Sequence, residues 1–131
     1  METANEAARS DGRFRQTAMV LEIRGLDLEV KRGLLLLRNI NLRLEKGEIV
    51  SVIGNNGAGK TTLLKTISGF MKPVKGDIFL QEKKITGMAP SRIAKLGIAH
   101  VPEDRRVFAK ETVRDNLYLG GIFPLVEREA A

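Results

Sequence analysis

The sequence predicts an α/β fold with a small antiparallel sheet in its N-terminal part. Apolar and polar residues alternate across residues 20–45, which is typical of strands that bury one face and leave the other in water. A nearly continuous apolar run follows at residues 49–53, and a glycine-rich loop at residues 54–59 connects it to a helical pattern at residues 61–68. Together these patterns indicate an antiparallel subdomain followed by alternating strands and helices.

The composition limits the kinds of protein that this chain can be. It has 131 residues, about one domain's worth, and no apolar run near the roughly 18 residues of a membrane span. It contains no cysteine and a single histidine, His100. The sequence therefore excludes a disulfide scaffold, a thiolate metal site and a cluster of imidazole ligands, and we expect a soluble, cytoplasmic protein.

The first 19 residues differ from the rest of the chain. They are polar and show no apolar periodicity, so we expect a disordered leader at residues 1–19 and the folded part at residues 20–131. The leader has no apolar stretch of the kind found in signal peptides. Met19 directly precedes the first patterned segment, so a natural start at Met19 is an alternative hypothesis.

The strands of the N-terminal part follow from the alternation of apolar residues. Leu21–Val30 is predicted to form a strand with a kink at Gly25, and residues 34–37 and 40–44 add antiparallel neighbours. Residues 49–53 are predicted to form a strand that is buried on both faces, because its residues are nearly all apolar.

The elements after the glycine-rich loop are predicted from helical spacing and turn residues. Leu63, Leu64 and Ile67 indicate the buried face of a helix at residues 61–68. The remaining elements are expected in this order: a strand at residues 77–80, a helix at 90–96, a strand at 98–101 and a helix that starts at Thr112. We expect His100 to be a packed or edge side chain of the strand at 98–101.

The glycine-rich loop carries the chemical information in this sequence. Residues 54–61 fit the pattern G-x-x-x-x-G-K-[ST], which is the Walker A motif. Its glycines permit backbone angles that other residues avoid, so that successive N–H groups can point at a phosphate, and the positive end of the following helix adds to the attraction. The residues expected to bind nucleotide are Gly54, Asn55, Asn56, Gly57, Ala58, Gly59, Lys60, Thr61 and Thr62.

Three side chains of this motif have predicted roles of their own. Lys60 is expected to reach the β- and γ-phosphates as a point charge, and we predict that it is catalytic as well. Thr61 is expected to supply one hydroxyl ligand to an octahedral Mg²⁺, and Thr62 to donate to phosphate. The predicted cofactors are therefore ATP and Mg²⁺, and a glycine-rich turn without a ligand is the alternative.

The positive charge of the chain lies in its middle third. Residues 60–110 contain eleven basic and four acidic side chains, whereas the whole chain has a formal net charge of +6. Such a segment suits a polyanionic ligand, an anionic membrane surface or nucleic acid. The charges lack the regular interleaving with aromatic residues that favours nucleic-acid binding, so we expect no nucleic-acid partner.

From about residue 21 to residue 118 the chain resembles the ATP-binding subunits of ABC transporters. Within this family, the sequence most resembles that of the second ATPase subunit of branched-chain amino-acid importers. The segments that carry this resemblance are "LEKGEIVSVIGNNGAGKTTLLKTISGF", "DIFLQEKKITGMAPSRIAKLGIAHVPEDRRVF" and "TVRDNLYLG". The resemblance implies a P-loop NTPase core and a protein that couples ATP binding and hydrolysis to transport. It also implies two kinds of partner, transmembrane permease subunits and a second ATP-binding subunit, and a place on the inner face of the cell membrane.

The resemblance implies two further site residues. Glu103 stands where the family carries the Q-loop glutamine, and so is expected to ligate Mg²⁺ and to take part in catalysis; the alternative is an exposed loop acid. Val30 falls near the aromatic residue that family members stack on adenine. Because an aliphatic side chain stacks weakly, we expect affinity to depend on the phosphates, with poor discrimination between ATP and GTP.

Other family motifs are absent from the 131 residues, so the resemblance is to the N-terminal half of the family's nucleotide-binding domain, a truncated fold. No aspartate follows an apolar run as in Walker B, and the LSGGQ signature does not occur. We therefore expect negligible hydrolysis by this chain alone, and thinly covered edges on the strand at residues 49–53. A non-catalytic nucleotide-binding or phosphate-binding module and an ABC ATPase outside transport remain alternatives.

Overall fold

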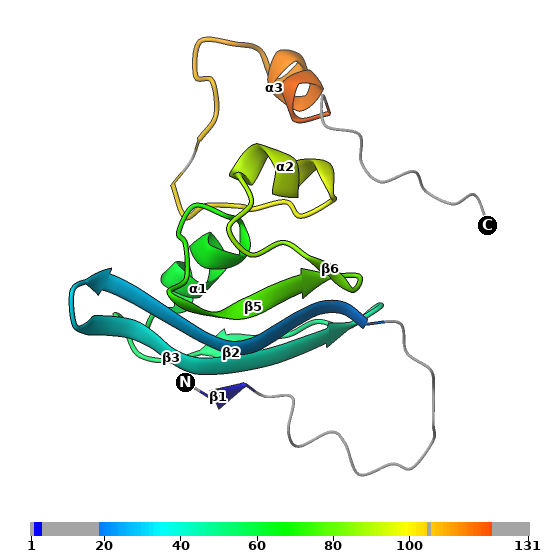
Figure 1. The fold of residues 1–131 in the computed structure, drawn as a ribbon. Helices are drawn as coiled ribbons and strands as arrows, with labels where there is room; N and C mark the ends of the chain where they lie inside the picture. The colour runs from blue at the N-terminus through cyan, green and yellow to red at the C-terminus, as the bar shows by residue number, and fades with distance from the viewer. Residues whose placement is uncertain (1, 4–18, 105, 122–131) are drawn as a thin grey trace.

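A four-stranded antiparallel sheet forms the centre of the structure, a computed structural model that describes residues 2–3, 19–104 and 106–121 (Figure 1). The strand order is β3-β2-β5-β6. The strands are β2 (Met19–Lys31), β3 (Leu34–Glu45), β5 (Lys75–Leu80) and β6 (Lys83–Lys84). Helices α1 (Lys60–Ile67) and α2 (Pro90–Lys95) lie on one face of this sheet.

The hairpin of β2 and β3 confirms the predicted antiparallel subdomain. Alternate residues of β2 enter the core, and the kink predicted at Gly25 is present, with a positive φ of 54° and a shift in register between Ile23 and Leu26. The two segments expected at residues 34–37 and 40–44 form one strand. Asn39 joins them with φ 47°, and its backbone N–H donates to Asp27 Oδ1 at 2.6 Å.

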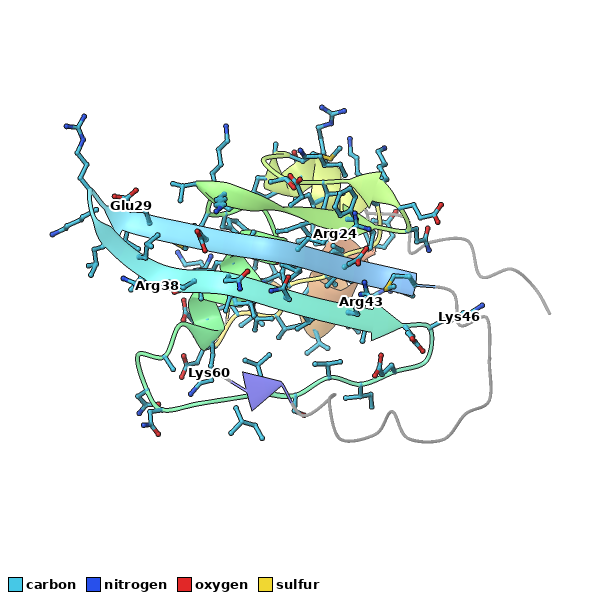
Figure 2. All side chains as sticks on the ribbon, turned by 60° about the horizontal axis from the view of Figure 1, so that its bottom comes forward. Arg24, Glu29, Arg38, Arg43, Lys46 and Lys60 are labelled. Atoms are coloured by element: carbon cyan, nitrogen blue, oxygen red, sulfur yellow. The ribbon has the colours of Figure 1, made fainter. Side chains whose placement is uncertain are left out.

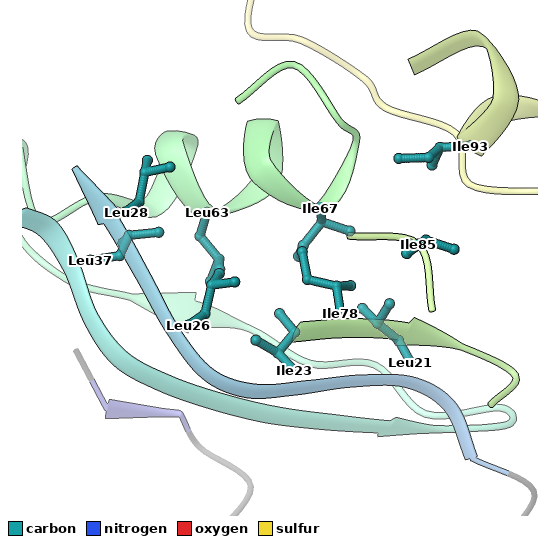
Figure 3. Packing of buried hydrophobic residues seen from close by; sticks show 10 residues of the cluster. All are labelled: Leu21, Ile23, Leu26, Leu28, Leu37, Leu63, Ile67, Ile78, Ile85 and Ile93. Atoms are coloured by element: carbon teal, nitrogen blue, oxygen red, sulfur yellow. The ribbon is translucent and has the colours of Figure 1, made fainter. Parts of the chain in front are cut away.

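The core lies between the sheet and the helices, as Figure 3 shows. Its members are all aliphatic: Leu21, Ile23, Leu26, Leu28, Leu37, Leu63, Ile67, Ile78, Ile85 and Ile93. One prediction about α1 is wrong, because Leu64 is 48% exposed. The buried face of α1 consists of Leu63, Thr66 and Ile67, since residues three and four apart share one side of a helix and the adjacent Leu64 turns away from it.

The strand predicted at residues 49–53 is much shorter than expected and is not buried. Only Val52–Ile53 form a strand, β4, and Ile49 and Ile53 are 93% and 68% exposed. A strand is buried on both faces only when neighbouring elements cover it. Among the described residues, β4 pairs with β1 (Glu2–Thr3) alone. The prediction of double burial is therefore wrong, whereas the prediction of thinly covered edges is confirmed.

In the C-terminal part of the described chain, the strand predicted at residues 98–101 is wrong and the helix predicted after Thr112 is confirmed. Residues 98–101 form no strand, and Val101 is 88% exposed, because no described strand lies beside them to complete a ladder. The helix predicted after Thr112 is present as α3 (Val113–Gly120). Thr112 Oγ1 accepts a hydrogen bond from the backbone N–H of Asp115 at 3.1 Å, which caps the helix as expected.

The expected leader falls mostly outside the described residues. Residues 2 and 3 form β1 and pair antiparallel with β4, while residues 4–18 are not described, so the leader and the domain boundary stay predictions. No helix in the described ranges is long and apolar enough to cross a membrane.

Candidate functional site

The Walker A loop begins where β4 ends and leads directly into α1. Gly59 is the N-cap of α1 and has φ 92°, a backbone angle that residues with a side chain rarely adopt. A Cβ atom at this position would lie 2.8 Å from Leu37 Cδ2 and 3.3 Å from the Leu36 carbonyl oxygen. The start of α1 therefore lies against β3, and it can do so because residue 59 is glycine.

The loop leaves several backbone N–H groups available at the start of α1. The Ala58 N–H donates to the Asn55 carbonyl at 3.0 Å, and the Leu63 N–H makes the first helical bond, to the Gly59 carbonyl, at 2.8 Å. In the described part of the chain, the N–H groups of Lys60, Thr61 and Thr62 donate to no acceptor. Because these groups lie at the positive end of a helix, the loop suits an anionic ligand.

The Lys60 side chain folds back over this loop. Its ammonium group donates to the carbonyl oxygens of Gly54 and Asn55, and the second contact measures 3.1 Å. Figure 2 shows Lys60 where the chain enters α1, beside β3. A phosphate oxygen is a stronger acceptor for an ammonium group than a neutral carbonyl, so a bound phosphate can take over these contacts.

The other predicted site residues are not joined to the loop. Val30 lies near the end of β2 and is 45% exposed, and Glu103 is an exposed residue without regular secondary structure. Within the described ranges, no hydrogen bond or ion pair connects Glu103 to the loop. The contacts of the structure thus bring together residues 54–62, while the roles of Val30 and Glu103 stay predictions.

The loop can offer a metal ion one oxygen ligand, but not a full set of protein ligands. Thr61 is exposed in the first turn of α1, and hydroxyl oxygen is a ligand that Mg²⁺ accepts. No group of three His, Cys, Asp or Glu side chains gathers in the described part of the chain. A metal held here would therefore take most of its ligands from phosphate and water.

A polar contact at the far end of α1 was missed by the sequence reasoning. His100 Nδ1 lies 3.0 Å from Ser68 Oγ, and the imidazole ring centroid lies 5.8 Å from that of Phe70. His100 is thus packed, as expected, but in a segment without strand structure. No sequence signal could have found this contact, because the two residues are 32 positions apart and belong to no shared motif.

A charged cluster lies on the sheet face opposite the helices. Glu22 is only 7% exposed and forms ion pairs with Arg24 at 2.6 Å and with Arg43 at 3.1 Å. The hydrogen bond from Arg24 is the main reason why the pKa of Glu22 is lowered. The Arg24 guanidinium also lies 4.6 Å from the ring centre of Phe79. This cluster ties β2 to its neighbours and is distant in sequence from the loop.

Comparison with known proteins gives two similar relatives among transport ATPases. The high-affinity branched-chain amino acid transport ATP-binding protein BraG of Pseudomonas aeruginosa is 45% identical over 87 residues, which is 66% of this chain and 37% of that protein. The nucleoside import ATP-binding protein NupA of Lactococcus lactis is 39% identical over 104 residues, which is 77% of this chain and 21% of that protein. The chain thus spans less than half the length of either relative.

The fold and the family comparison agree with these relatives. A solved ATP-binding cassette of an ABC transporter matches with a TM-score of 0.74 and 29% identity, over 82% of this chain and 42% of that one. This likeness confirms the predicted fold class, the first part of an ABC ATPase domain. The family model described as "ABC transporter" matches residues 37–131. The chain therefore belongs to the ABC transporter family.

Proposed function

We propose that residues 54–62 bind the triphosphate of ATP and that the chain is the nucleotide-binding part of an ABC importer ATPase. The observation that carries this proposal is the loop itself. Three N–H groups that have no acceptor among the described residues lie there at the start of α1, and the Lys60 ammonium group lies over the same loop. A phosphate chain would satisfy both kinds of donor at once.

The side chains of Lys60 and Thr61 have different proposed roles at the phosphates. Lys60 would exchange its carbonyl partners for phosphate oxygens, and Thr61 would hold Mg²⁺ through its hydroxyl group. When bound, Mg²⁺ neutralises charge on the phosphate oxygens. Glu103 is proposed as a further ligand and Val30 as an aliphatic contact to the base, so that affinity comes mainly from the phosphates.

A charge-removal experiment at the loop tests this function. We expect Lys60→Ala to weaken binding of a fluorescent ATP analogue at least tenfold, because hydrogen bonds from a charged group contribute about 1.5–3 kcal/mol each. Lys65→Ala is the matched control: it removes the same charge from the other end of α1, where the side chain is exposed. Equal affinities of the Lys60 and Lys65 variants, measured by fluorescence titration, would contradict the proposal.

A nucleotide-binding module without catalysis is the second candidate. The described carboxylates favour it, because neither Glu103 nor Asp104 is joined to the loop, and Asp104 pairs with Arg106 at 3.3 Å. Without a carboxylate beside the loop, the described part of the chain holds no group in place to orient the attacking water. Phosphate release measured in the same titration samples tests whether this chain has any catalytic activity of its own, and we expect ATP to be bound but not turned over.

The transport role rests on the similar relatives. We propose branched-chain amino acids as the solute, because BraG has the higher identity, whereas NupA is named for nucleosides. The proposed partners are transmembrane permease subunits and a second ATP-binding subunit, and the proposed place is the cytoplasmic face of the cell membrane. Within the described ranges, no helix is long and apolar enough to span that membrane.

A further inference from the structure

We propose that His100 is a positioning residue for the nucleotide site. By donating a hydrogen bond from Nδ1 to Ser68 Oγ, it ties the segment that carries Glu103 to the far end of α1. The significance of this tie rests on the proposed function of residues 54–62, because α1 begins at that loop. The geometry of the tie does not depend on any ligand.

The direction of the hydrogen bond follows from the single proton of the serine hydroxyl. Ser68 Oγ donates that proton to the Leu64 carbonyl oxygen at 2.9 Å. At its 3.0 Å contact with His100 Nδ1 the hydroxyl must therefore accept, so Nδ1 carries a proton. Both the neutral Nδ1–H tautomer and the imidazolium ion can donate in this way, so the bond persists whichever of these two forms is present.

Contacts with neighbouring residues support the hydrogen bond. The end of α1 is fixed by bonds from the Gly69 N–H to the Thr66 carbonyl at 3.1 Å and from the Phe70 N–H to the Lys65 carbonyl at 2.9 Å. The Phe70 and His100 rings meet at 59° between their planes. Two residues earlier, Ile98 packs against the hydrophobic core. A segment without strand or helix is thus held at two neighbouring points.

The tie is made at the opposite end of a short helix from the loop. The loop donors lie in the first turn of α1 and Ser68 caps its C-terminal end, and the whole helix has only eight residues. Because a helix this short moves as a unit, a displacement of the loop on nucleotide binding would carry Ser68 and His100 with it. Glu103 follows His100 by three residues, so we infer that the tie restrains where the segment that carries Glu103 begins.

Nuclear magnetic resonance can test the tie directly, because His100 is the only histidine of the chain. At about pH 8, where an ordinary imidazole is neutral, we expect the ring nitrogen shifts of the full chain to report the Nδ1–H tautomer. In Ser68→Ala we expect the Nε2–H tautomer, which predominates in free histidine. An Nε2–H signal that is the same in the wild-type chain and in Ser68→Ala would overturn the proposal.

Hydrogen exchange of the Gly69 and Phe70 amides, which are hydrogen-bonded at the end of α1 beside the tie, is the second readout; it is measured without nucleotide and with two matched substitutions. His100→Phe keeps a ring against Phe70 and removes the donor, whereas His100→Asn keeps a donor near the Nδ1 position and removes the ring. We expect exchange about fivefold faster in His100→Phe, substantial rescue in His100→Asn and no change in β2. Unchanged exchange in His100→Phe would contradict the positioning role.

The third arm separates this inference from the proposed function. Adding MgATP should shift the His100 ring signals of the wild-type chain and leave those of Lys60→Ala unchanged. If the wild-type chain binds the nucleotide in the fluorescence titration but its His100 signals do not move, the tie does not report on the loop and the inference fails alone. If the wild-type chain does not bind the nucleotide at all, the proposed function fails, whatever the tautomer of His100.

Discussion

Strand β2 alternates apolar and charged residues, whereas β4 belongs to a nearly continuous apolar run, and the two strands have very different surroundings. β2 runs for 13 residues between β3 and β5, and Ile23 and Leu26 are buried completely against the helices. β4 has two residues and a single described neighbour, and both its own Ile53 and the preceding Ile49 are exposed. An apolar run in the sequence therefore does not by itself predict a long, buried strand, because burial depends on neighbours distant in sequence.

The largest expected effect comes from removing side chains in the two regions. Leu26→Ala should lower the free energy of unfolding by about 2–5 kcal/mol, because it leaves a cavity in the core. Ile49→Ala is the matched variant near β4 and should change that free energy by less than about 0.5 kcal/mol. Urea unfolding followed by circular dichroism measures both, and equal losses would show that residue 49 is buried in solution.

The second-largest effect is expected from a substitution that tests how closely the backbones of β2 and β5 approach each other. Gly76 has φ 84°, and a Cβ atom there would lie 2.3 Å from the Gly25 carbonyl oxygen. We expect Gly76→Ala to lower the unfolding free energy by about 1–3 kcal/mol or more, since backbone cannot move aside as a side chain can. Gly47→Ala, with φ 79° and open space around it, isolates the cost of the backbone angle. If the two variants unfold at the same urea concentration, the close contact is absent.

The smallest effect concerns the charged cluster on β2 and depends on pH. The pKa of Glu22 is lowered in the folded chain, chiefly by the hydrogen bond from Arg24, relative to an ordinary value of 4.5. Its stabilising contribution is therefore complete above the unfolded-state pKa and is lost as the pH falls through the folded-state pKa. Glu22→Gln should be less stable than the wild-type chain at about pH 7, and the difference in stability should shrink as the pH falls below the ordinary pKa of a glutamate.

Urea midpoints at several pH values measure this difference. Arg38→Gln serves as a control for general charge effects, because it changes a charge on the neighbouring strand β3 without an ion pair of its own among the described residues. A stability gap between wild-type and Glu22→Gln chains that persists at low pH would mean that the carboxylate acts through packing rather than charge.

Local features of the structure could be predicted from the sequence, whereas long-range ones could not. The Walker A loop, the kinked β2 and the cap of α3 at Thr112 each depend on a few adjacent residues, and all are present where expected. The Ser68–His100 contact and the pairing of β1 with β4 join residues tens of positions apart, and no spacing rule encodes them. Residues 98–101 show the converse, since a locally strand-like sequence stays irregular without a partner.

The pairing of Glu2 with Ile53 and of Thr3 with Val52 has a practical consequence for how the chain is produced. A polypeptide that begins at Met19 would keep β2 whole but would lack β1. Strand β4, which precedes the Walker A loop, would then lose its one described neighbour. An affinity tag joined ahead of Glu2 would, for the same reason, start close to that loop. Expression vectors that differ only in their start codon or tag position should therefore yield preparations that differ in solubility at this exposed edge.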